Sequence, residues 1–359
     1  MSKNLLKIGI THGDINGVSY EIMLKVLNDN RILEHCVPII YGSPKVLAFY
    51  KKMYAFDSVN ISTVRSVADA VFSRMYVINC CSDEIKVETG KQSTEAGKFA
   101  LDALNIASSD LIEGRIDALI TAPINKSTIQ SDKFNFPGHT EFLEKLSGQR
   151  SLMMLTSGNV RVALVTNHTA IHNVSPSITK ELIIEKLKVL HQSLVQDFAI
   201  TCPRIAVLGL NPHSSDNGLL GKEEQTIIKP AIDEANLQGI VCTGPLSSDG
   251  FWGAGTFASY DAILAMYHDQ GLAPFKALFQ DTGVNFTAGL SFVRTSPAHG
   301  TAYNIAGKNA ANPSSLSQAL YLAIDVVRNR AFYKQAIKNP LKVDTPKADE
   351  NGLEIMNYE

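Results

Sequence analysis

The chain of 359 residues lacks an excess of charge of either sign, since 33 basic and 35 acidic side chains leave a formal net charge of −2. Without a basic stripe or an acidic block, the sequence shows no sign of a nucleic-acid-binding surface or of extended disorder. No apolar run is long enough to cross a bilayer, and the first residues show no signal-peptide pattern. These absences predict a soluble, cytoplasmic protein without membrane or nucleic-acid partners.

Cysteine is scarce, and its spacing is not that of a disulfide framework. The five cysteines include no Cys-x-x-Cys pair and leave one over from any pairing: Cys36, Cys80, Cys81, Cys202 and Cys242. This pattern argues against structural disulfides and a structural zinc site, and it predicts reduced thiols. Gly/Ser linkers and repeats of solenoid length are also absent, so any domains are expected to pack closely.

Short apolar runs alternate with segments of helical spacing. The predicted strands of the first half are 5–11, 37–41, 59–64, 75–79 and 118–121. The longest predicted helix, 93–113, has Ala, Leu and Ile three and four positions apart. This alternation is typical of an α/β fold with a mostly parallel sheet.

The length allows two domains. Segment 114–121 and the region after Gly300 are the places where the chain is expected to cross between them. The prediction is a discontinuous first domain, 1–130 plus 300–359, and a second domain, 131–299, with the active site in the cleft between them.

Three strands predicted in the second half are each followed by a histidine. They are 160–167 before His168, 204–212 before His213 and 262–267 before His268. In open α/β sheets, ligands bind outside the carboxyl ends of the strands. Three imidazoles placed there can converge on one metal ion, with a fourth position open for substrate or water. A single histidine in such a place is usually structural, but three predict a shared metal or catalytic cluster.

The last of these segments continues through His268 and Asp269 and, after a predicted proline-containing turn, reaches Lys276. An imidazole can bind a metal or move a proton, and a neighbouring carboxylate can orient it. The lysine can hold an anion. The alternative is an ordinary strand end with solvated polar groups.

A possible anion site consists of Lys276, Asn285 and Arg294, which are nine residues apart on predicted loops and strand ends. Arginine supplies a planar fork and lysine a point charge, and both suit a phosphate or a carboxylate. Segment 294–302 is expected to open the next helix and to add hydroxyl and amide groups. The alternative is that all three side chains are simply solvated.

Two glycine-containing segments carry local motifs. Segment 137–141 precedes a predicted helix, with Thr140 as the expected N-cap, and a helix start favours an anion. A capped helix alone explains Thr140 and Glu141, but it does not explain His139. Segment 253–258 fits G-x-G-x-x-A, yet no strand is predicted directly before it, so a Rossmann loop is not expected.

Taken together, four motifs resemble those of the 4-hydroxythreonine-4-phosphate dehydrogenase family of pyridoxal phosphate (vitamin B6) biosynthesis. They are Pro-Gly-His-Thr-Glu at 137–141, Leu-Asn-Pro-His at 210–213, Tyr-His-Asp-Gln-Gly-Leu at 267–272 and Arg-Thr-Ser-Pro-Ala-His-Gly-Thr-Ala at 294–302. The resemblance runs from about residue 5 to about residue 327. It implies a two-domain α/β/α sandwich of the isopropylmalate and isocitrate dehydrogenase type, and a homodimer whose active site is shared across the interface.

The resemblance also implies the ligands and the reaction. A divalent ion (zinc, magnesium or cobalt) would be held by His168, His213 and His268, the last reaching in from the partner subunit. The phosphorylated substrate would be contacted by His139, Thr140, Lys276, Asn285 and Arg294. NAD or NADP would accept hydride from C3 of 4-phosphohydroxy-L-threonine, and loss of carbon dioxide would give 3-amino-2-oxopropyl phosphate. The candidates for the general base or its relay are Asp249, Asp269 and Lys276.

The chain departs from the family pattern at two places. The loop 13–21 lacks two prolines and one glycine, and Ser-Ser-Asp at 214–216 replaces the usual Ala-Gly-Glu. All implied metal and substrate positions carry the expected residue types, so an active enzyme is predicted. The alternatives are the same chemistry on 4-phosphorylated threonate or erythronate, a metal-dependent hydrolase or lyase, and a non-catalytic phosphometabolite-binding protein.

Overall fold

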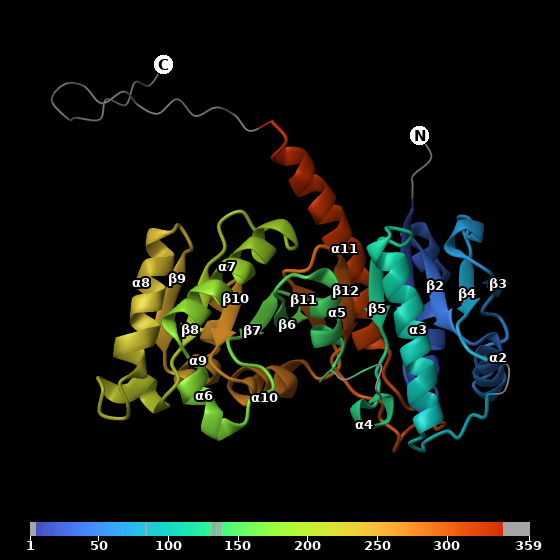
Figure 1. Cartoon of the computed structure of the whole chain (residues 1–359), viewed down its shortest axis with the longest axis horizontal. Helices are drawn as coiled ribbons and strands as arrows, with labels where there is room; N and C mark the ends of the chain where they lie inside the picture. The colour runs from blue at the N-terminus through green and yellow to red at the C-terminus, as the bar shows by residue number, and fades with distance from the viewer. Residues whose placement is uncertain (1–4, 83–84, 131–133, 135, 137, 340–359) are drawn as a thin grey trace.

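The computed structural model describes residues 5–82, 85–130, 134, 136 and 138–339, and the predicted polar tail from Pro340 onward lies outside this part. One sheet of 12 strands runs through the molecule (Figure 1). The strands are β1 (Leu6–Thr11), β2 (Cys36–Gly42), β3 (Ile61–Val64), β4 (Met75–Asn79), β5 (Ala118–Thr121), β6 (Leu152–Ser157), β7 (Val160–Leu164), β8 (Ile205–Leu208), β9 (Cys242–Leu246), β10 (Ala262–Ala265), β11 (Val284–Ala288) and β12 (Val293–Pro297).

The sheet has two parallel halves of opposite direction. Its order is β3-β4-β2-β1-β5-β12-β11-β6-β7-β10-β8-β9. The first half, from β3 to β12, is parallel throughout, and so is the second half, from β7 to β9. Between them β11 pairs antiparallel with β12 and β6, and β6 pairs antiparallel with β7. Because the strand direction reverses three times, the strands of the second half run opposite to those of the first half.

Helices connect the strands, and two of them begin where the sequence predicts a helix start. Ser43 and Ser93 cap their helices by accepting backbone N–H groups of Val46 and Ala96. The helices are α1 (Ser19–Leu27), α2 (Pro44–Met53), α3 (Thr94–Ile112), α4 (Lys126–Ile129), α5 (His139–Ser147), α6 (Ile171–Ser177), α7 (Lys180–Gln196), α8 (Lys229–Leu237), α9 (Ser248–Gly253), α10 (His268–Phe279) and α11 (Ser314–Ala336). Within the described residues, no helix is both long and apolar enough to cross a membrane.

Both faces of the sheet are buried. In β8, Ile205 and Val207 belong to one apolar cluster, whereas Ala206 and Leu208 belong to another. Successive side chains of a strand point to opposite faces, so apolar layers cover both sides. This arrangement confirms the predicted α/β fold with a mostly parallel sheet.

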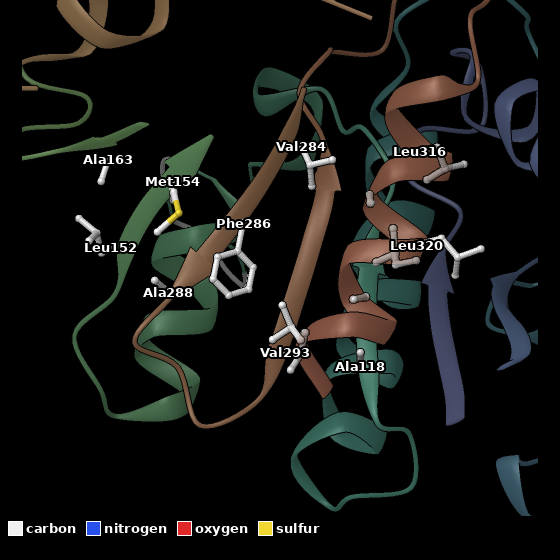
Figure 2. Packing of buried hydrophobic residues seen from close by; sticks show 14 of the residues in the cluster. Ala118, Leu152, Met154, Ala163, Val284, Phe286, Ala288, Val293, Leu316 and Leu320 are labelled. Carbon is white, nitrogen blue, oxygen red and sulfur yellow. The ribbon is translucent and has the colours of Figure 1, made fainter. Parts of the chain in front are cut away.

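An apolar cluster joins the two halves where they meet (Figure 2). Phe286 of β11 is fully buried between Met154 of β6 and Val293 of β12, and Leu316 and Leu320 of α11 belong to the same cluster. Helix α11 packs against β5, β11 and β12. The core therefore runs continuously across the antiparallel junction.

Replacing Phe286 with alanine is expected to lower the free energy of unfolding by about 3–5 kcal/mol, because it leaves a cavity at this junction. Phe332→Ala is the matched control, since Phe332 is 69% exposed, and its cost is expected to stay within about 0.5 kcal/mol. Urea denaturation measures both values. A cost below about 1 kcal/mol for Phe286→Ala would contradict the packing described here.

Three local predictions were wrong. Lys276 lies in helix α10, which continues from His268 through Pro274, and not after a turn. Helix α10 packs tightly on β7, as Gly271 shows: a Cβ added there would lie only 2.8 Å from a side-chain atom of Val162. This close packing outweighs the helix-breaking tendency of Pro274.

The other two errors concern helix starts. Segment 294–297 is strand β12, and the next helix, α11, begins only at Ser314. The N-cap of α5 is Gly138 and not Thr140. Pro137, the first residue of that motif, lies outside the described residues.

Candidate active site at the junction of the two sheet halves

A cavity of about 310 Å³, here called the cleft cavity, lies where the two halves of the sheet meet. It is lined by the end of β5, the start of α5, and residues of β6, α10, β11 and β12. All five predicted substrate-contact residues line it, together with two of the three predicted metal ligands: His139, Thr140, His168, His268, Lys276, Asn285 and Arg294. Tertiary structure thus brings residues 139 to 294 into one site.

Arg294 is the most deeply buried cation of the cleft cavity. Its side chain on β12 is 2% exposed. Nε and Nη2 donate to Thr121 Oγ1 at 3.0 and 2.6 Å, and Nη1 donates to Thr287 Oγ1 at 3.1 Å. No carboxylate forms an ion pair with it in the part of the chain that the structure describes. Burial lowers its pKa to about 10. A buried, unpaired guanidinium is costly and is therefore suited to an anionic ligand.

Four other polar atoms around the cleft cavity are buried without a hydrogen-bond partner among the described residues. They are His139 Nε2, Glu141 Oε2, Asn285 Oδ1 and His299 Nε2. Each unmatched group costs about 1–3 kcal/mol, so four around one cavity indicate a polar ligand. Burial, followed by the charges of Arg294 and Lys126, holds the pKa of His139 well below its usual range. Its imidazole is therefore neutral at pH 7.

His168 and His268 lie side by side at one end of the cleft cavity. Their ring centroids are 5.9 Å apart. His168 Nδ1 lies 3.3 Å from Glu141 Oε1, and His268 Nδ1 lies 3.4 Å from Asp269 Oδ1. The contact with His168 also lowers the pKa of Glu141. A carboxylate on one ring nitrogen orients the other toward a metal or a substrate.

His213 lies apart from the other two histidines. As predicted, all three follow strands of the sheet, and the structure shows these strands to be parallel neighbours in the order β7, β10, β8. However, His213 does not line the cleft cavity, and no group of three potential metal ligands occurs among the described residues. After β8 the five residues 213–217 all have positive φ, from 46° to 68°. This left-handed turn, unusual for residues with side chains, holds His213 outside the cavity.

Only one of the three candidates for the general base lines the cleft cavity. Asp249 is exposed on α9, where a hydrogen bond from Ser247 lowers its pKa. The side chain of Asp269 is 74% exposed and does not line the cavity. Lys276 does line it.

Four further side chains line the cleft cavity but were not predicted from the sequence as site residues. They are Thr121, Lys126, Glu141 and His299. Thr121 and Lys126 stand at and just beyond the carboxyl end of β5. The three histidines were predicted because ligands bind at the carboxyl ends of strands, and the same rule applies to Thr121 and Lys126.

The first loop, which departs from the family pattern, is held by hydrogen bonds. Asn16 Oδ1 accepts from the backbone N–H of Glu88 at 2.8 Å. The hydroxyl of Tyr20 accepts from the backbone N–H of Ser43 and contacts His12 Nδ1, both at 3.1 Å. His12 Nε2 contacts the carbonyl oxygen of Phe99 at 3.0 Å. These polar contacts, made by Asn16, Tyr20 and His12, hold the first loop in place.

His12 is expected to make stability depend on pH. Burial lowers its pKa from 6.5 to about 4, so between these values the unfolded chain binds a proton that the folded chain does not. Stability therefore falls as the pH falls through this window, by about 2 kcal/mol from His12 between pH 7 and pH 5. His12→Gln is expected to lose that part of the slope in urea denaturation at both pH values. An unchanged slope would contradict a neutral, buried His12.

The fold and the cleft cavity define an α/β protein with a polar cavity, suited to a small anionic ligand, between two halves of a sheet. A family model described as "Pyridoxal phosphate biosynthetic protein PdxA" matches residues 34–323. The chain belongs to this family, which confirms the resemblance drawn from the four motifs.

Individual relatives agree with this assignment. The chain is similar to a 4-hydroxythreonine-4-phosphate dehydrogenase of Bacteroides thetaiotaomicron, with 56% identity over 95% of this chain and 94% of the relative. It is 37% identical to an Oceanobacillus iheyensis protein provisionally named a D-threonate 4-phosphate dehydrogenase, over 91% of this chain and 99% of the relative. The crystal structure of a 4-hydroxythreonine-4-phosphate dehydrogenase from Klebsiella pneumoniae has a TM-score of 0.78 at 31% identity, covering 91% of this chain and 99% of that chain.

Proposed function

We propose that the chain is a cytoplasmic, NAD(P)-dependent dehydrogenase. It oxidises 4-phosphohydroxy-L-threonine at C3, with decarboxylation to 3-amino-2-oxopropyl phosphate, in pyridoxal 5'-phosphate biosynthesis. The observation that carries this proposal is the buried, unpaired guanidinium of Arg294 in a cavity ringed by unmatched polar atoms. The names of the Bacteroides and Klebsiella relatives support the same substrate.

In this proposal, the substrate is held mainly by charge. Arg294 supplies a two-pronged contact for the phosphate, and Lys126 adds positive charge on another wall of the cavity. Neutral His139 and the amide of Asn285 use their unmatched atoms to fix the rest of the substrate. A substrate held at both ends has its C3 hydroxyl placed for reaction.

The residues present fit a divalent metal ion held between subunits. His168 and His268 offer two imidazoles that carboxylates orient, and both line the cleft cavity. A third imidazole is then His213 of the partner subunit, whereas the resemblance implied that His268 crosses the interface. A metal ion held there would lower the pKa of the substrate hydroxyl and stabilise the developing charge, and a bound NAD(P) would supply the hydride acceptor.

Exposed apolar side chains support a homodimer in which His213 crosses the interface. Leu219 and Leu220, on the turn after His213, are 77% and 43% exposed, and Ile171, three residues after His168, is 70% exposed. Apolar residues exposed around a functional site are typical of an interaction surface. In a twofold-symmetric dimer, the region of Leu219 and Leu220 in each subunit would contact the region of Ile171 in the other.

Within each chain, we infer two domains with the bounds 1–130 plus 300–359 and 131–299. The opposite directions of the two sheet halves support this division, except that β12 lies within the bounds of the second domain and pairs with β5 in the first half. Strands β12 and β11 carry the sheet across the junction. Lys276 is our choice for the general base or its relay, since it is the one candidate that lines the cavity. In that role, the amine takes the proton of the C3 hydroxyl.

The test is the absorbance of reduced nicotinamide when the protein is mixed with 4-phosphohydroxy-L-threonine and NAD or NADP, with and without EDTA. Reduction that EDTA abolishes is the expected result, and the faster cofactor identifies the acceptor. Turnover of 4-phosphorylated threonate or erythronate alone would keep the chemistry and overturn the substrate. Metal-dependent turnover without nicotinamide would instead support a hydrolase or lyase. No turnover of any phosphorylated substrate would leave only a binding protein.

A further inference from the structure

A second cavity, here called the rear cavity, lies on the opposite face of the sheet junction and has a volume of about 260 Å³. Neighbouring residues of the same strands line the two cavities. Leu155 and Asn285 line the cleft cavity, whereas Thr156 and Val284 line the rear cavity. Because successive side chains of a strand point to opposite faces, the two cavities lie back to back.

Arg161 of β7 lines the rear cavity and has the same features as Arg294. Its side chain is 9% exposed, and its guanidinium lies 4.4 Å from the centre of the Phe198 ring. Nη1 donates to the backbone oxygens of Asn159 and Asp261 at 3.0 and 3.2 Å. Nε has no acceptor, and no carboxylate forms an ion pair with Arg161, among the residues described. A buried cation of this kind calls for an anionic group in the cavity.

The wall formed by α11 carries the complementary charge. Gln318, Asp325 and Asn329 line the rear cavity from successive turns of this helix. Asp325 is exposed, and within the described part of the chain its carboxylate has neither a hydrogen bond nor an ion pair, although the charges of Arg328 and His35 act on it. The other acid of the lining, Asp197, is already neutralised by Arg330 at 2.6 Å. The cavity thus offers one unpaired cation and one unpaired anion from different elements.

We propose that the rear cavity binds a small zwitterion of the amino-acid type, with its carboxylate at Arg161 and its ammonium group at Asp325. The carboxylate of Asp325 in the lining disfavours a phosphate dianion, and the volume suits a molecule smaller than a typical drug. This site is separate from the proposed dehydrogenase activity.

A ligand in the rear cavity would link the two sheet halves. Helix α11 packs on β5 and β12 of the first half, whereas Arg161 and Phe198 belong to the second half. Strand β11 borders both cavities through Val284 and Asn285. A shift of β11 when an amino acid binds would therefore also move Asn285 in the wall of the cleft cavity.

Isothermal titration of the full chain with glycine, L-alanine and L-threonine tests the proposal, with acetate, methylammonium and inorganic phosphate as partial mimics. At least one amino acid is expected to bind saturably, and at least about tenfold more tightly than acetate or methylammonium. Asp325→Asn and Arg161→Met are each expected to weaken that binding at least about tenfold. Arg31→Met, at an arginine that is 81% exposed, is the matched control and is expected to bind like the unchanged protein.

Three outcomes would overturn the proposal. The first is that none of the three amino acids binds. The second is that binding is unchanged in Asp325→Asn; Asp325 is exposed, so this substitution is not expected to unfold the chain. The third is that Arg294→Met abolishes the binding, because the amino acid would then occupy the cleft cavity. The readout is heat of binding, so it does not depend on whether the chain reduces nicotinamide.

Discussion

Arg294→Met is expected to raise KM for the phosphorylated substrate by about 30- to 4,000-fold. Removing one partner of a buried, hydrogen-bonded charge pair costs about 2–5 kcal/mol, and each 1.4 kcal/mol is a factor of ten. Arg294 is 2% exposed and bonded only to threonine hydroxyls within the described structure, so in the proposed function the substrate anion would be its charged partner. Steady-state kinetics of nicotinamide reduction gives KM and kcat separately.

Two comparisons sharpen this prediction. Arg294→Lys keeps the charge but loses the fork, so its KM is expected between those of the unchanged protein and Arg294→Met. Arg31→Met removes an arginine that is 81% exposed and is expected to leave KM unchanged. An unchanged KM in Arg294→Met would remove the anion site from the proposed mechanism.

Stability is expected to move in the opposite direction from affinity. Arg294 is buried without an ion pair in the described structure, so its desolvation is not offset in the free protein. Arg294→Met is therefore expected to keep or raise the free energy of unfolding measured in urea. This result would show that the arginine serves the ligand and not the fold. A large loss of stability would contradict that reading.

Mixing two inactive variants, His168→Ala and His213→Ala, is expected to restore activity. His168 and His268 line the same cavity in one chain, and His213 lies outside it. A mixed dimer then contains one site in which all three histidines are intact. With random exchange of subunits, half of the dimers are mixed and each has one working site, so about a quarter of the original activity should return.

The matched control is a mixture of His168→Ala with His268→Ala. Both side chains belong to the same cavity of one chain, so every site in every dimer lacks one histidine and no activity should return. Recovery in this control but not in the first mixture would mean that His268 crosses the interface, as the family resemblance implied. Each variant alone, assayed with added zinc, magnesium or cobalt, provides the baseline.

Local sequence patterns determined much of the fold. Strands such as β2 and β4 were predictable because buried parallel strands are short, continuous apolar runs. Helices α2 and α3 were predictable from Ser43 and Ser93, since a capping hydroxyl acts within one turn of its own chain. The positions of the three histidines after β7, β8 and β10 also followed from such local patterns.

Only the tertiary structure decided how these pieces form a site. Helix α10 forms through Pro274 because Gly271 lets it pack closely on β7, a contact that no local pattern contains. Lys276, Asn285 and Arg294 meet because a helix and two antiparallel strands fold back on one another, not because of their equal spacing.

His213 shows the same limit most clearly. Its strand lies beside the other two, yet a left-handed turn holds the imidazole outside the cavity. By itself, the sequence determined which residue types stand at the ends of which strands, because strand and cap signals are local. Which of these residues share one cavity depended on contacts between segments more than 100 residues apart, and those exist only in the folded chain.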